Sequence, residues 1–130
     1  MTLPVTAPST ILLVDDSPPL LEALQYLLQD EHDLQVVGVA ETGQGGIELA
    51  AELKPDLVLL DIQLPDMLGY DVSRALKALP FPPVVILISA HGDQASVERT
   101  IAAGSDAFIE KSNDWTGIVQ KIRRTLAARS

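Results

Sequence analysis

The sequence contains no cysteine and only two histidines, His32 and His91. Without cysteine the chain forms neither disulfide bonds nor thiolate metal sites. Two histidines are too few for the imidazole cluster of a zinc centre. Any metal that the chain binds must therefore be a hard ion held by oxygen ligands.

Basic residues are also few. The 130 residues include 9 lysines and arginines against 18 aspartates and glutamates, which gives a formal net charge of −9. An acidic surface repels the phosphates of nucleic acids and of anionic lipids. We therefore expect no direct contact with nucleic acid or with a membrane.

Long hydrophobic runs are absent, although 47% of the residues are hydrophobic. The longest run, VVILISA at 84–90, falls well short of the ~20 residues that span a membrane. The first ten residues lack the basic and apolar regions of a secretion signal. These absences predict a soluble, cytoplasmic protein, and the length suits one domain with a single core.

Two kinds of segment alternate after residues 1–9, which carry Pro4 and Pro8 and are expected to form a loose tail. Five short β-branched or leucine-rich runs are typical of strands buried on both faces. They occupy residues 10–14, 34–39, 56–60, 84–88 and 106–110. Segments with helical spacing of apolar residues lie between and after them, at about 18–28, 44–53, 72–79, 93–102 and 115–126.

Two of these helices have features that matter later. The first has Ser17 at the N-cap position and Pro18 at the first helical position, where a missing N–H costs nothing. The fourth has only Val97, Ile101 and alanines to bury, so we expect it to be the most weakly anchored of the five.

The alternation itself indicates the fold. Five strand–helix units in about 120 residues predict a parallel sheet with helices on both faces, and right-handed crossovers leave few topologies. We predict an α/β, doubly wound, flavodoxin-like domain with strand order 2-1-3-4-5 and five helices.

Polar residues follow the predicted strands where each one ends. Asp15 and Asp16 follow the first strand, Asp61 the third, Ser89 the fourth, and Glu110-Lys111 the fifth. In the predicted order, strands one and three are neighbours, so the three aspartates should crowd together unless a cation lies among them. Three carboxylates without histidine or cysteine indicate a site for Mg²⁺ or Mn²⁺.

The same residues suit phosphoryl transfer. Asp61 can act as a nucleophile that forms an aspartyl phosphate. The Lys111 ammonium, the Ser89 hydroxyl and a bound divalent ion would then stabilise the equatorial oxygens of the phosphoryl group.

Four stretches carry a family resemblance: LLVDD at 12–16, DIQLPDMLG with Asp61, Pro65 and Gly69 in fixed spacing, ISA at 88–90, and AAGSDAFIEK at 102–111. Together they resemble the receiver domain of two-component response regulators, the CheY-like superfamily. The resemblance covers residues 10 to about 128, and no output domain is recognised in the sequence.

The resemblance implies roles for named residues. Asp61 would accept a phosphoryl group from a sensor histidine kinase or a phosphotransfer protein. Asp15, Asp16 and the backbone carbonyl of Gln63 would hold Mg²⁺ together with Asp61. The phosphate-binding and switch residues would be Ser89, Ala90, Phe108 and Lys111, with Gln63 and His91 tuning dephosphorylation. Such a domain catalyses only its own phosphorylation and dephosphorylation, so it is not expected to be an enzyme with a separate substrate.

One position departs from many receivers. Ser112 follows Lys111, where those domains have a proline with a cis bond, so we expect a trans bond here. Ser112 or Asn113 is expected to cap the last helix. Lys-Ser at this position is similar to receivers of regulators that carry a C-terminal helix-turn-helix.

Several alternatives stay open. A phosphatase of the haloacid dehalogenase type needs a second aspartate two residues after its nucleophile, but Gln63 follows Asp61 and Ser17 follows Asp15. A receiver-like interaction module that does not use phosphate is a second alternative. Flavin binding is disfavoured, since three carboxylates repel a cofactor that carries phosphate. Phe108 can equally be a core residue, and Asp66 reads as a turn residue.

The resemblance and the charge pattern also suggest an output surface. The fourth predicted helix (about 93–102), the fifth strand (106–110) and the fifth helix (about 115–126) are expected to change on phosphorylation and to bind a partner. Helix 5 offers Lys121, Arg123 and Arg124 opposite Asp93 and Glu98, which suits a homodimer through this face.

Overall fold

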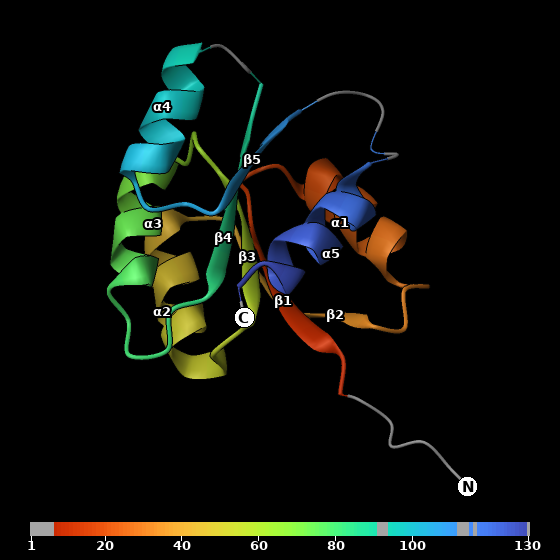
Figure 1. Cartoon of the computed structure of the whole chain (residues 1–130). Helices are drawn as coiled ribbons and strands as arrows, with labels where there is room; N and C mark the ends of the chain where they lie inside the picture. Colours follow the sequence, from red (N-terminus) through yellow and green to blue (C-terminus); the bar gives the residue numbers. More distant parts are fainter. Residues whose placement is uncertain (1–6, 91–93, 112–114, 116, 130) are drawn as a thin grey trace, which may run out of the picture.

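The computed structural model describes residues 7–90, 94–111, 115 and 117–129. Over these residues five strands alternate with five helices (Figure 1). The strands are β1 (Ser9–Val14), β2 (Leu34–Ala40), β3 (Leu57–Asp61), β4 (Val84–Ser89) and β5 (Ala107–Glu110). The helices are α1 (Pro18–Leu28), α2 (Gly43–Leu53), α3 (Gly69–Lys77), α4 (Gln94–Ala102) and α5 (Ile118–Ala127).

The strands form one parallel sheet in the order β2-β1-β3-β4-β5. Helices α1 and α5 cover one face, and α2, α3 and α4 cover the other (Figure 1). The predicted fold class, strand order and doubly wound arrangement are therefore confirmed.

Alternating side chains of the strands build two apolar layers. Ile11 and Leu13 of β1 belong to the layer under α1 and α5, whereas Leu12 and Val14 belong to the layer under α2, α3 and α4. Because both faces are covered, β1 appears in the sequence as a continuous apolar run. No helix in the described part of the chain combines the length and apolar character that crossing a membrane requires.

The start of α1 agrees with the sequence prediction. Ser17 is the N-cap, its hydroxyl oxygen accepts a hydrogen bond from the Leu20 N–H at 3.4 Å, and Pro18 opens the helix. The inner side of α1 carries Leu21, Leu24 and Leu28, which are buried, whereas Leu20 is only partly buried.

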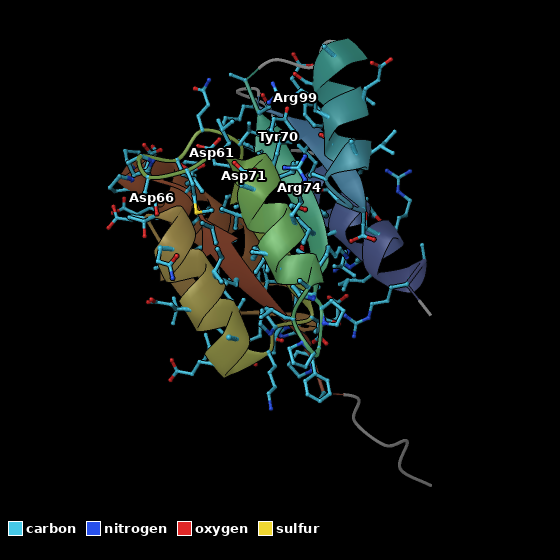
Figure 2. The ribbon with its side chains drawn as sticks, turned by 90° about the vertical axis from the view of Figure 1, so that its left-hand side faces the viewer. Asp61, Asp66, Tyr70, Asp71, Arg74 and Arg99 are labelled. Carbon is cyan, nitrogen blue, oxygen red and sulfur yellow. The ribbon has the colours of Figure 1, made fainter. Side chains whose placement is uncertain are left out.

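Helix α4 packs differently from the prediction. Ile101, expected to face the core, is 70% exposed, whereas Thr100 is 3% exposed and lies on the inner side. The Thr100 hydroxyl is satisfied by the Ser96 carbonyl, which allows a polar residue at this buried position. The guanidinium of Arg99 also lies over the Tyr70 ring of α3, 4.4 Å from its centroid (Figure 2).

Helix α5 begins later than predicted. Its N-cap is Gly117, without a side-chain cap, so the assignment of Ser112 or Asn113 as the cap is wrong. Those two residues and the predicted trans bond between Lys111 and Ser112 lie outside the described residues. Trp115 precedes the helix and packs partly buried against the α1–α5 layer.

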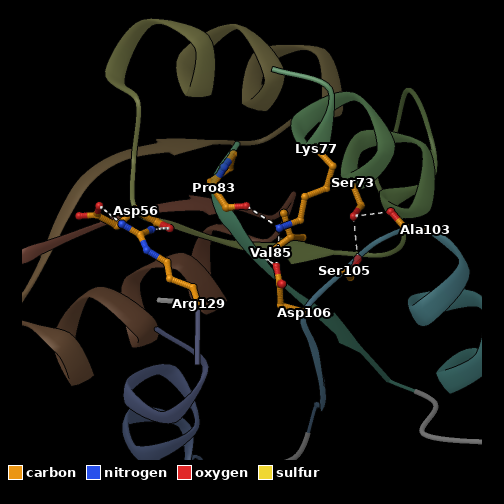
Figure 3. A network of polar contacts seen from close by, with 9 residues as sticks. All are labelled: Asp56, Ser73, Lys77, Pro83, Val85, Ala103, Ser105, Asp106 and Arg129. Carbon is orange, nitrogen blue, oxygen red and sulfur yellow. Dashed lines mark hydrogen bonds and ion pairs between the residues drawn. The ribbon is translucent and has the colours of Figure 1, made fainter. Parts of the chain in front are cut away.

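Polar contacts stabilise the end of the sheet at which the strands begin. Asp56, just before β3, accepts hydrogen bonds from the backbone N–H and the hydroxyl of Thr10 and from Arg129. Lys77 of α3 pairs with Asp106 at the start of β5 (Figure 3). These contacts lie at the amino ends of the strands, opposite the carboxyl ends that carry Asp15 and Asp61.

Candidate functional site

Three aspartates converge at the carboxyl ends of β1 and β3. Asp15 and Asp16 follow Val14, which pairs with Leu60 in the neighbouring strand, and Asp61 is the last residue of β3. One carboxylate oxygen from each aspartate lies within 4.8 Å of the others. The register of two adjacent parallel strands thus produces the acidic cluster that the sequence predicted.

The three carboxylates differ in their surroundings. Asp15 is 3% exposed and Asp61 is 5% exposed, whereas Asp16 is open to solvent. Asp15 Oδ1 accepts a hydrogen bond from the Ser17 N–H at 2.8 Å. Asp15 Oδ2 is buried and accepts no hydrogen bond among the described residues, although the Lys111 ammonium lies 3.4 Å from it. This oxygen therefore has an electrostatic contact with Lys111 but no hydrogen-bond donor among the described residues.

Charge repulsion is concentrated on Asp61. Burial raises the pKa of its carboxyl group, and the charge of Asp15 raises the pKa further. Lys111, 3.3 Å from Asp61 Oδ2, and the backbone N–H of Gln63 act in the opposite direction without cancelling the effect. The site therefore favours an additional cation.

The donor set fits a hard divalent metal. All three side chains offer carboxylate oxygens, the buried Asp15 Oδ2 accepts no hydrogen bond among the described residues, and burial together with the charge of Asp15 raises the pKa of Asp61. Magnesium prefers such oxygen ligands and leaves further positions to water or to substrate phosphate. The residues present are therefore suited to Mg²⁺ or Mn²⁺.

The chain leaves Asp61 through a tight loop that returns to the start of α3. The Gly69 N–H donates to the Ile62 carbonyl at 2.6 Å, and Gln63 forms an isolated antiparallel bridge with Leu68. A Cβ atom at Gly69 would lie 2.4 Å from the Asp61 carbonyl oxygen, so only glycine fits there. The D-x-x-x-P-x-x-x-G spacing thus describes a loop closed at its base.

A cavity of about 330 Å³ lies beside the acidic cluster. Of the predicted site residues, it is lined by Asp16, Asp61, Gln63, Ser89, Ala90 and Lys111. Asp15 is not among its lining residues, but Asp15 Oδ2 lies 3.4 Å from the ammonium group of Lys111, which lines the cavity. A larger groove of about 1000 Å³ between α1 and α5, next to Tyr26 and Trp115, has no lining residue in common with it.

Phe108, predicted as a switch residue, does not line this cavity. Phe108 pairs with Leu87 in β4 and packs partly buried against the α2–α4 layer, as a core residue does. His91 lies outside the described residues. Ser89, by contrast, ends β4 in a buried position, and its carbonyl accepts a hydrogen bond from the Lys111 N–H at 2.6 Å.

Sequence reasoning missed the part that Asp66 plays in this loop. Asp66 Oδ1 accepts a hydrogen bond from the Gly43 N–H at 2.7 Å, and its Oδ2 accepts one from the Gln44 N–H at 2.9 Å. These hydrogen bonds lower the pKa of Asp66. No local pattern indicates this contact, since the partners lie 22 and 23 residues earlier in the chain.

The model of the response regulator receiver domain family matches residues 11–123 of this chain. The chain belongs to this family. Its relatives include the nitrate/nitrite response regulator protein NarL of Escherichia coli (strain K12), which is 32% identical over 120 residues, 92% of this chain and 56% of NarL. The transcriptional regulatory protein KdpE of Mycobacterium tuberculosis is 40% identical over 113 residues, 87% of this chain and 49% of KdpE. The receiver chain therefore spans about half the length of these curated relatives.

Solved structures agree with this assignment. The signal receiver domain of a response regulator NarL from Mycobacterium tuberculosis superposes with a TM-score of 0.89 at 31% identity, covering 95% of this chain and all 100% of that one. The response regulator domain of Thermotoga maritima CheB gives a TM-score of 0.84 at 27% identity over 92% of this chain and 97% of that chain. The receiver fold is thus shared along nearly the whole chain.

Proposed function

We propose that this receiver domain takes a phosphoryl group onto Asp61 from a sensor histidine kinase or a phosphotransfer protein, in a reaction that depends on Mg²⁺ or Mn²⁺. The observation that carries the proposal is the convergence of three aspartates and Lys111 on one cavity. Membership of the receiver family supports this class of reaction, and the arrangement of these four residues supports Asp61 as the acceptor.

The chain's own residues have distinct parts in the transfer. An Asp61 carboxylate oxygen attacks the phosphorus atom, so that an O–P bond forms while the N–P bond to the donor imidazole breaks and the electron pair returns to that nitrogen. Asp15, Asp16, Asp61 and the Gln63 carbonyl would hold the divalent ion. The bound ion supplies positive charge that offsets the meeting of a phosphate with three carboxylates.

The remaining cavity residues bind the transferred group. The Lys111 ammonium would pair with a phosphoryl oxygen, and the Ser89 hydroxyl and the Ala90 backbone N–H, from residues that line the same cavity, would donate hydrogen bonds to the others. Gln63, exposed at the rim, and His91 tune the approach of the water that removes the phosphoryl group.

A phosphatase acting on separate substrates is less well supported. Its general acid would occupy the position of Gln63, whose amide cannot donate a proton to a leaving group. A module that does not use phosphate is also less well supported. Burying the carboxylates of Asp15 and Asp61 costs stability that Lys111 alone does not offset, and such a module gains nothing from that cost.

The proposed output passes from Ser89 to the surface of α4, β5 and α5, with Phe108 changing its packing. This surface would bind a downstream protein or a second receiver. Arg123 is not available to such a partner, because it is bound to Glu31 and Asp33 at 2.7 and 2.8 Å. Lys121 and Arg124 are the basic residues left on α5 for this purpose, and Asp93 lies outside the described residues.

Mass spectrometry after incubation with acetyl phosphate tests the reaction. We expect a phosphoryl-sized adduct on Asp61 in the presence of Mg²⁺, no adduct in EDTA, and none in Asp61→Asn. Asp71→Asn removes an exposed carboxylate of α3 and serves as the matched control that retains the adduct. Equal modification in EDTA, or modification of Asp61→Asn, contradicts the proposal.

A further inference from the structure

The loop from Ile62 to Leu68 carries one proposed metal ligand, the Gln63 carbonyl, and is fixed internally only at its base. The Gly69 N–H to Ile62 contact and the Gln63–Leu68 bridge close that base. Residues 64–67 form the tip beyond the bridge. Without a contact outside the loop, this tip would be free to tilt and to carry Gln63 with it.

Leu64 and Met67 of the tip pack against the apolar layer under α2, α3 and α4, and Asp66 adds polar contacts with the first turn of α2. Its two carboxylate oxygens accept the N–H groups of Gly43 and Gln44, which have no partner within the helix (Figure 2). Next to it, Met67 lies so close to Gly43 that a Cβ atom there would be 2.4 Å from the Met67 Cγ. The loop tip and the helix end therefore fit together as one unit.

The electrostatics of this contact favour a charged carboxylate. The positive end of the α2 dipole and two N–H donors face Asp66, and the hydrogen bonds from Gln44 and Gly43 lower its pKa. The same amino-terminal end of α2 is also capped by Thr42, whose hydroxyl oxygen accepts a hydrogen bond from the Gly45 N–H at 3.0 Å. One helix end is thus capped twice, once from its own chain segment and once from the loop beside Asp61.

We propose that Asp66 is a positioning residue for the metal and phosphoryl site. By anchoring the loop tip to α2, it keeps the Gln63 carbonyl directed toward the cavity that Asp16 and Asp61 line. The inference rests on the proposed function, because it assigns Asp66 an effect on metal binding at that site. An outer group that orients a metal ligand commonly changes metal affinity by about 10-fold or more when removed.

The test compares two caps of the same helix. Asp66→Ala and Thr42→Ala each remove a cap, and each is expected to lower the unfolding temperature in EDTA by roughly 3–8 °C. Titration of the folded proteins with MgCl₂ should separate them: the dissociation constant rises about 10-fold in Asp66→Ala and stays at the wild-type value in Thr42→Ala. Asp66→Asn retains the shape and one acceptor oxygen, so its dissociation constant should fall between the two.

Each outcome decides a particular point. If Asp66→Ala binds Mg²⁺ as tightly as the wild type, Asp66 is a helix cap only and the inference is wrong. A similar loss in Thr42→Ala also overturns it, because the effect would then belong to the helix end in general. Should Asp66→Ala fail to fold, Asp66→Asn decides by the same comparison. If the wild-type protein itself binds no Mg²⁺ and forms no adduct, the proposed function fails and takes the inference with it.

Discussion

The ammonium group of Lys111 lies 3.3 Å from Oδ2 of Asp61, at the end of the central strand of the sheet. The same ammonium is 3.4 Å from Asp15 Oδ2. One lysine thus shares its charge between the two most buried carboxylates of the site. This charge balance leads to the first prediction.

Lys111→Ala should make the fold more dependent on metal. Without the ammonium, Asp15 and Asp61 repel each other unscreened, so the variant should unfold at a lower temperature than the wild type in EDTA. Added MgCl₂ should then raise its unfolding temperature by about 4 °C more than it raises that of the wild type, equivalent to roughly 1 kcal/mol. Thermal unfolding with and without Mg²⁺ measures both quantities. An equal Mg²⁺ response in the two proteins would show that Lys111 does not balance these carboxylates.

Asp16→Asn and Asp15→Asn should separate metal binding from folding. Asp16 is exposed, so its substitution should change the free energy of unfolding in EDTA by less than about 0.5 kcal/mol while weakening Mg²⁺ binding by roughly 10-fold. Asp15 is buried and accepts the Ser17 N–H, so its substitution should change both. Calorimetric titration and denaturant unfolding provide the two measurements. Wild-type Mg²⁺ affinity in Asp16→Asn would remove Asp16 from the metal site.

Much of this site followed from sequence because it depends on strand ends. Asp15 and Asp61 had to meet once β1 and β3 were parallel neighbours, since the period and length of the apolar runs determine where each strand ends. Lys111 follows β5, which β4 separates from β3, and its long side chain reaches both carboxylates. Strand order predicted that Lys111 lies at the same end of the sheet, but not which carboxylates it contacts.

Other features depended on contacts that a local pattern does not encode. Asp66 binds a helix that lies more than twenty residues earlier, and nothing near it in sequence indicates that partner. Ile101 has the spacing of a core residue, but it is exposed, and the neighbouring Thr100 is the buried residue of α4 instead. Arg123 was expected to face a partner, yet α5 is rotated so that this residue meets Glu31 and Asp33.

Asp56 should make stability depend on pH in the acid range. Burial alone would raise its pKa, but the hydrogen bonds from Thr10 and the contact with Arg129 outweigh burial and lower it below the ordinary value of 3.8. A carboxyl group whose pKa is lower in the folded state adds stability above its unfolded pKa and loses it as pH falls through its folded pKa. Asp56→Ala should therefore cost about 1–2 kcal/mol at pH 7, and this difference should shrink once the pH falls below 3.8.

Denaturant unfolding at several pH values checks the Asp56 prediction. Asp71→Ala is the matched control, because it removes an exposed carboxylate that pairs only with Arg74 on the same helix. Its effect should be small at every pH. A cost for Asp56→Ala that is constant from pH 7 to pH 3 would argue that the lost contacts do not involve the charged form.

Ser89→Ala should leave phosphorylation of Asp61 intact but remove the structural response of α4, β5 and α5. The nucleophile and the proposed metal ligands are intact in this variant, so modification of Asp61 should continue. The hydroxyl proposed to read the phosphate is gone, so most of the response in α4, β5 and α5 should be lost. Hydrogen exchange with and without beryllofluoride measures that response in the wild type and the variant. A full response in Ser89→Ala, or a wild-type response confined to α1 and α2, would contradict the proposed output.

The ties made by α5 have a consequence for how the chain folds as it is synthesised. Arg123 binds Asp33 across 90 positions of sequence, Arg129 binds Asp56 across 73, and Ile118 and Ile122 complete the apolar layer that α1 begins. Until α5 has left the ribosome, only α1 covers that face of the sheet, and the apolar layer lacks Ile118 and Ile122. Closure of the domain therefore requires α5, and a nascent chain stalled before residue 118 would expose apolar side chains of the kind that chaperones bind.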